Sequence, residues 1–215
     1  MKREPSNAIY RSALMIRFVW LAVVLVALSA CGPALPSLNF SVPNVGASSH
    51  RLEAEVRSLT VTLARPDEAT GNILAGAEEL LPLWKDSLED ALNRMAIFKD
   101  DGPMKLSFSV KVRKLNVPPW GASVESAVGA RYELIDRNSG SVVFSTDVES
   151  TGHVEATYAF MGTTRSIEAI NRAVQNNILQ FLQQLETVDL GKPMYPKKPM
   201  YPNKPAADAG GKPTS

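Results

Sequence analysis

Residues 104–113 read MKLSFSVKVR, and every second side chain from Met104 to Val112 is apolar while those between are polar. Successive side chains of a β-strand point to opposite faces, so this alternation predicts a strand with one buried and one hydrated face. Strands of this kind belong to antiparallel sheets that are covered on one side only. The preceding residues 100–103, DDGP, have the composition of a turn, and we interpret their aspartates as turn formers.

Two more strands follow this segment along the chain. They are predicted at Val124–Ile135 and Val142–Glu149, with the irregular sequence NVPPWG at residues 116–121 before the first of them. DRNSG at residues 136–140 joins the pair as a hairpin loop with its glycine at the end. The chain therefore contains three consecutive antiparallel strands.

Two long segments have helical periodicity. Apolar residues recur at steps of three and four in Ala77–Phe98. Pro82 is tolerated only in the first turn of a helix, so we expect the helix to start near Leu80 or Leu81, with Trp84 in the core. The second helix is predicted at Arg165–Leu185, after a connecting loop at 153–164. Its remaining faces are rich in amides, which we interpret as plain surface rather than a partner-facing stripe: Gln175, Asn176, Asn177, Gln180, Gln183 and Gln184.

A first strand is expected within Arg51–Ala64, where the alternation slips near Arg57-Ser58 and so indicates a bulge or a break. The order of elements is β-α-β-β-β-α. It predicts an α+β fold, a two-layer sandwich with a mostly antiparallel four-stranded sheet and two helices packed on one face. The first strand joins the sheet through a crossover that contains the first helix.

The N-terminus has the features of a secretory signal. Residues 18–27, FVWLAVVLVA, follow basic residues and form an apolar core of about ten residues, too short for the roughly 20 that span a bilayer. Leu28-Ser29-Ala30-Cys31 resembles the lipobox of bacterial lipoproteins. That resemblance implies cleavage before Cys31 and acyl chains on Cys31 as the membrane anchor. A chance cysteine after an ordinary signal, or an uncleaved anchor, is the alternative, and translation starts at Met1 or Met15.

Gly32 follows the cysteine, whereas aspartate at this position is similar to the inner-membrane retention signal of enterobacterial lipoproteins. This difference predicts an outer-membrane lipoprotein that faces the periplasm. Four segments are expected: a lipoprotein signal peptide at 1–30, a lipidated N-terminus and tether at 31–50, an α+β periplasmic domain at 51–190 and a disordered Pro/Lys-rich tail at 191–215. The tail contains KPMYP twice, so Tyr195 and Tyr201 are candidate partner-binding residues.

The charge distribution excludes a nucleic-acid partner. The chain has a net charge of +1, but residues 1–30 carry +3 and residues 191–215 carry +4, which leaves −6 on residues 31–190. Phosphate backbones require clustered lysine and arginine, and an acidic body lacks them.

No motif of catalysis, metal binding or phosphate binding occurs in the chain, so we expect no catalytic residue, no metal site and no cofactor. The single cysteine excludes a cysteine-based zinc site, and the two histidines, His50 and His153, are far apart. His153 near Glu155 is the one coincidence that a cryptic hydrolase could use, and we interpret it as an exposed loop histidine.

The layout from the lipobox to the second helix resembles the YajG family of small bacterial outer-membrane lipoproteins. The segments that carry the resemblance are ARYELI at 130–135, STDVESTG at 145–152 and SIEAINRAV at 166–174. The family has no established catalytic residues, so the resemblance implies a location and a non-enzymatic role. The Pro/Lys-rich tail departs from the family pattern.

A second resemblance is to auxiliary lipoproteins of lipid-transport ABC systems. It implies that the hydrated sheet face or the aromatic loops 117–120 and 158–161 dock a partner. Trp120 is the candidate anchor, unless it folds back onto the core. The sequence thus predicts a non-catalytic interaction or envelope-assembly module with an envelope protein partner, and the transport subunit is the alternative. Its oligomeric state is open.

Overall fold

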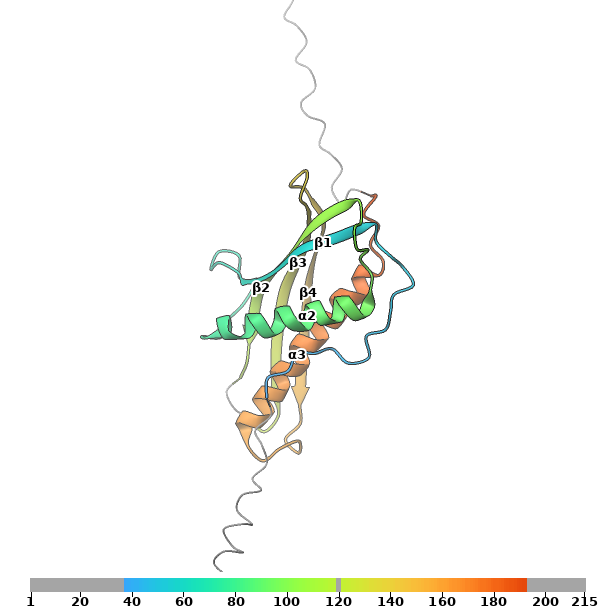
Figure 1. Cartoon of the computed structure of the whole chain (residues 1–215). Helices are drawn as coiled ribbons and strands as arrows, with labels where there is room; N and C mark the ends of the chain where they lie inside the picture. The colour runs from blue at the N-terminus through green and yellow to red at the C-terminus, as the bar shows by residue number, and fades with distance from the viewer. Residues whose placement is uncertain (1–36, 119–120, 193–215) are drawn as a thin grey trace, which may run out of the picture. The chain divides into compact units, whose positions relative to one another are not determined.

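The computed structural model describes residues 37–118 and 121–192 (Figure 1). Its elements follow the predicted order: β1 (Ala54–Leu63), the 3-10 turn η1 (Ala77–Leu80), α2 (Leu81–Met95), β2 (Met104–Asn116), β3 (Val124–Asp136), β4 (Val142–Val154) and α3 (Gly162–Leu185). Within these described ranges, neither helix is long and apolar enough to cross a bilayer.

The four strands form one sheet in the order β1-β2-β3-β4. β1 pairs with β2 in parallel, and the two other pairs are antiparallel, as a crossover through the first helix requires. The register of β1 shifts between Val56 and Ser58, so Arg57 is the extra residue of a bulge. The predicted α+β class and the predicted slip are both confirmed.

Both helices cover the same face of the sheet, and Figure 1 shows them side by side in front of the strands. All four strands contribute to the core, among them the alternating apolar residues of β2, and Trp84 of α2 is buried as expected. Tyr132 of β3 stacks on Phe181 of α3 with a centroid separation of 4.1 Å. The sandwich therefore has one apolar interior and one uncovered sheet face.

Several boundaries differ from those expected, and the first helix ends at Met95 instead of Phe98. β2 extends three residues further than Arg113, β4 extends five residues beyond Glu149, and α3 begins at Gly162 instead of Arg165. The β3–β4 ladder continues until Val124 faces Val154, and this pairing places His153 in a strand instead of a loop. Gly152 lies directly under α3, where a Cβ atom would be 2.1 Å from the carbonyl oxygen of Ala169.

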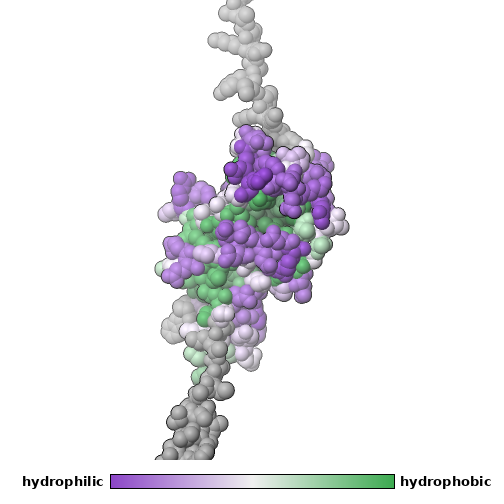
Figure 2. Space-filling model, viewed as in Figure 1, coloured by the Kyte–Doolittle hydropathy of each residue, from purple (hydrophilic) through white to green (hydrophobic). Residues whose placement is uncertain are grey.

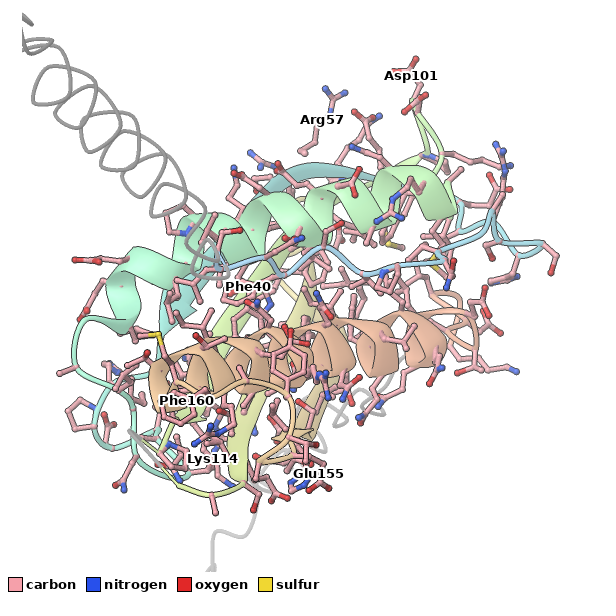
Figure 3. The ribbon with its side chains drawn as sticks, turned by 90° about the horizontal axis from the view of Figure 1, so that it is seen from below. Phe40, Arg57, Asp101, Lys114, Glu155 and Phe160 are labelled. Atoms are coloured by element: carbon pink, nitrogen blue, oxygen red, sulfur yellow. The ribbon has the colours of Figure 1, made fainter. Side chains whose placement is uncertain are left out.

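The expected tether at 31–50 is corrected over its described part. Residues 37–50, which we call the strap, lie against the domain, and Phe40 and Val42 are each 1% exposed. Figure 3 shows Phe40 between the two helices. The Arg94 guanidinium donates to the Val42 carbonyl at 2.9 Å. The strap lacks a sequence period because it is a single irregular segment that fills the seam between α2 and α3.

The amide-rich helix is also corrected, because its amides do more than cover surface. Asn177 is fully buried: its Oδ1 accepts from the Tyr132 hydroxyl at 2.7 Å, and its Nδ2 donates to the Val148 carbonyl at 2.9 Å. Asn171 donates to the Ser37 carbonyl at 3.2 Å and accepts from the Asn39 N–H. These amides hold β4 on one side of α3 and the strap on the other.

Candidate functional site

The site residues that the sequence predicts lie outside the described residues. They are the lipobox Leu28, Ser29, Ala30 and Cys31, and the candidate partner-binding residues Trp120, Tyr195 and Tyr201. Lipidation at Cys31 and partner binding by the three aromatic residues therefore stay predictions. The candidate sites described below are formed by residues 37–118 and 121–192 alone.

His153 is on the uncovered face of β4 with two carboxylates near it. Its Nε2 is 3.0 Å from Glu155 Oε1, and its Nδ1 is 3.9 Å from Glu125 Oε2. All three side chains are well exposed to solvent, so the ion pairs are weak. No hydroxyl or thiol nucleophile is hydrogen-bonded to this histidine in the part of the chain that the structure describes, so the cluster lacks the arrangement of a hydrolase.

Other titrating groups are structural. Burial raises the pKa of Tyr132 far above its usual range, and its hydroxyl donates to Asn177 inside the core, where no substrate reaches it. The nearby Trp84 indole N–H acts in the opposite direction and lowers the pKa of Tyr132, but it is the smaller effect. The indole N–H itself has no hydrogen bond of normal geometry. Within residues 37–118 and 121–192, no three acidic, histidine or cysteine side chains gather as metal ligands would.

The uncovered face of the sheet carries ion pairs across the strands. Asp147 of β4 accepts from Arg131 of β3 at 2.7 Å and from Arg113 of β2 at 3.0 Å. The Arg131 hydrogen bond first and the Arg113 hydrogen bond second hold the pKa of Asp147 below its usual value, against partial desolvation. Lys114 pairs with Glu149 at 3.5 Å beside them. The exposed charged side chains keep this face of the sheet hydrated. Because their opposite charges largely cancel, the face has no strong electrostatic potential.

A groove of 560 Å³ lies between edge strand β1 and helix α2. β1 contributes residues 55–59, and α2 contributes Glu89, Leu92 and Asn93, which share one helix face by their spacing of three and four. Ala96, which caps the C-terminus of α2 in the left-handed conformation, also lines the groove. The segment 98–100 closes one end, where the Lys99 N–H donates to the Ala54 carbonyl. The groove is thus built by the bulged strand and by the turn that returns the chain to β2.

The groove combines an apolar floor with a charged rim. Figure 2 shows hydrophobic surface in the hollow between β1 and α2, bordered by hydrophilic side chains. The floor is formed by the apolar members of the lining: Val56, Leu59, Leu92, Ala96 and Phe98. Arg57 and Arg51 lie on the rim, and Arg57 projects from the domain in Figure 3. The groove therefore offers both apolar and charged contacts to a ligand.

The groove was not predicted from the sequence, although the slip in alternation that shapes it was. Arg57 marks the bulge in the sequence, but the facing residues come from the C-terminal half of α2, and only the crossover brings the two together. A bulge at a sheet edge bends the strand and often re-aims side chains at a functional surface. The unexpected charge in an otherwise alternating strand was the available signal.

The two aromatic loops of the sequence analysis come together at one end of the sheet. Arg165 donates to the carbonyls of Ala159 and Phe160 in one loop and to the Gly121 carbonyl in the other. The Ser166 hydroxyl donates to the Pro118 carbonyl at 3.0 Å. Phe160 is fully exposed. The first turn of α3 therefore holds both loops in place.

Comparison with protein-family models finds no match for the chain, and comparison with curated proteins finds none. Solved structures with a similar arrangement exist at low identity. A Xanthomonas campestris protein of the DUF330 family is 11% identical, and the match covers 71% of this chain and 98% of that one with a TM-score of 0.42.

Two further structures are similar at the same level. A minor lipoprotein from Acinetobacter baumannii is 10% identical over 60% of this chain and 92% of its own, with a TM-score of 0.37. The PelC dodecamer from Paraburkholderia phytofirmans is 14% identical over 63% and 92%, with a TM-score of 0.37. At these values the similarity identifies neither a family nor a function, and the YajG resemblance is not confirmed.

Proposed function

We propose that this chain is a periplasm-facing lipoprotein of the bacterial outer membrane, anchored by acyl chains on Cys31, that acts as a non-catalytic interaction or envelope-assembly module. The lipobox-like sequence at 28–31 behind a short apolar core supports the anchor. Gly32, in place of aspartate, supports the outer membrane. The module binds an extended segment of an envelope protein partner in the groove between β1 and α2.

The observation that carries the binding proposal is the position of the groove beside a sheet edge. β1 ends the sheet, and an extended peptide recognises such an edge by adding a strand and placing alternate side chains in a neighbouring pocket. The floor offers apolar contacts to one side of that peptide, while Arg57 and Glu89 on the rim offer charges of both signs. Binding there needs no catalytic group.

The test is crosslinking in the native envelope. A photo-crosslinking amino acid at Arg57, in the full-length anchored protein, should capture a specific partner that a pull-down then identifies. Asn93→Trp, which places a large ring in the groove from an exposed helix position, should abolish the crosslink. Asp86→Trp is the matched control, because Asp86 is also exposed on α2 but does not line the groove.

The anchor is tested in the same cells by Cys31→Ser. Loss of both the membrane fraction and the crosslink would support an anchored interaction module, and mass spectrometry of the wild type should find acyl chains on Cys31. A crosslink that survives Asn93→Trp would refute the groove as the binding site. The captured protein distinguishes envelope assembly from the alternative, a lipid-transport ABC system.

A further inference from the structure

The end of the domain near the start of α3 exposes an unusual amount of apolar side chain. Phe160 is fully exposed, and Tyr158 and Met161 are each about half exposed; we call these three residues the apolar tip. Arg165 fixes the backbone beneath them by donating to the carbonyls of Ala159 and Phe160. A fixed, exposed phenylalanine in a short apolar cluster is typical of a surface that meets another apolar phase.

The docked strap limits how far the domain can move from the anchor. The Ser37 carbonyl accepts from Asn171 of α3, and Phe40 is buried three residues later. Only six peptide units separate Ser37 from Cys31, and fully extended they span at most about 21 Å. The backbone of Cys31, to which the acyl chains would be attached, can therefore lie at most about that distance from Ser37, which is hydrogen-bonded to Asn171. A chain that was free as far as residue 50 would have about three times this reach.

The short reach from Cys31 favours an orientation in which the end of the domain near the start of α3 lies closest to the membrane. Asn171 is nine residues from Gly162, which corresponds to about 14 Å along the axis of α3, and the apolar tip directly precedes Gly162. The other end of α3, at Leu185, is 14 residues away, or about 21 Å, which equals the whole reach of the tether. The β3–β4 hairpin turn at 136–141 belongs to that distant end, because Val124 and Val154 pair at the end near the tip.

We infer that the apolar tip inserts into the interface of the bilayer that holds the Cys31 acyl chains, so that the lipoprotein rests on the membrane with the start of α3 downward. This inference rests on the proposed lipid anchor. Phe160 and Met161 enter the acyl boundary, and Tyr158, with the Arg172 guanidinium 5.3 Å from its ring centre, stays at headgroup level.

The charges around the tip suit a zwitterionic lipid surface. The Arg165 guanidinium is engaged with loop carbonyls, and Arg172 pairs with Glu168 at 2.7 Å. Glu155 pairs with His153 at the margin of the tip, and Figure 3 shows Glu155 and Phe160 on the same side of the domain. With the cations engaged in this way, apolar burial and the anchor together hold the tip on the membrane.

The test measures depth in the membrane with the full lipidated protein. Phe160→Cys, at a fully exposed position, is labelled with an environment-sensitive fluorophore, and the protein is reconstituted in phosphatidylcholine vesicles with brominated acyl chains. Acylation consumes the Cys31 thiol, so the label reports residue 160 alone. Asn138→Cys, exposed in the β3–β4 turn at the distant end, is the matched control. We expect at least about twofold quenching at 160 and almost none at 138.

The possible failures are distinguishable. Equal, weak quenching at 160 and 138 in a protein whose Cys31 is acylated would overturn the inference and leave the lipid anchor intact. A label found on Cys31 would show a free thiol there and would overturn both. Shielding of residue 160 in native envelopes but not in protein-free vesicles would assign the tip to a protein partner and also overturn the inference.

Discussion

Replacing Phe40 with alanine tests whether the strap is part of the folded domain. The Phe40 side chain is 1% exposed and meets the Trp84 ring edge-on with a centroid separation of 6.4 Å. Truncating a buried phenylalanine costs about 3–5 kcal/mol, because the transfer free energy is lost and a cavity remains. That cost is a large part of the roughly 5–15 kcal/mol by which domains are stable.

The assay is urea unfolding of the mature chain carrying Cys31→Ser, followed by tryptophan fluorescence. With a slope of roughly 2 kcal/mol per molar urea, Phe40→Ala should lower the midpoint by about 2 M. Ser41→Ala is the matched control, because Ser41 is the next residue of the strap and is exposed, so its cost should stay within about 0.5 kcal/mol.

A Phe40→Ala midpoint as close to wild type as that of Ser41→Ala would refute the reasoning. The strap would then be a free tether, and the limit on the reach from Cys31 would disappear with it. A large loss would show that Phe40 is part of the folded core and that the strap is docked on the domain.

The other predictions concern α3 and the uncovered sheet face. Asn177→Ala should cost about 1–3 kcal/mol in urea unfolding, because it leaves the buried Tyr132 hydroxyl without its acceptor. Gly152→Ala should cost at least about 2 kcal/mol in the same assay, because its Cβ would meet the α3 backbone at 2.1 Å. The Glu68 carboxylate should titrate near a pKa of about 2 by NMR, held down first by the Lys111 hydrogen bond. Because that pKa is lowered in the folded state, the stability it contributes is present above about 4.5 and declines as the pH falls toward 2. Lys111→Ala should raise the pKa of the Glu68 carboxyl, while the hydrogen bonds from Arg65 continue to lower it.

Local patterns were sufficient for the elements of the fold. The alternation in β2 arises because one sheet face is packed under helices and the other is hydrated, and both conditions are visible in the order of residues. The start of α2 was predictable from Pro82, which fits only the first turn. The slip at Arg57 revealed the bulge, because a single extra residue reverses the facing of all that follow.

Tertiary contacts decided what these patterns left open. A buried asparagine and an exposed asparagine look the same in a sequence, and only the partner groups on β3 and β4 make Asn177 a core residue. The strap has no period to detect, since it is held by contacts with residues far along the chain, such as Arg94 and Asn171. The groove likewise required the parallel crossover that sets α2 beside β1.

The sequence by itself determined the α+β class, the order of the elements and the facing of β2, because hydrophobic burial imposes a period that local order records. It also predicts the lipid anchor at Cys31 through a short motif. Only the tertiary structure decided where the strap docks, which amides are buried and which edge has a groove. These features depend on contacts between side chains that are far apart in the sequence, and such contacts produce no periodic pattern in the local sequence.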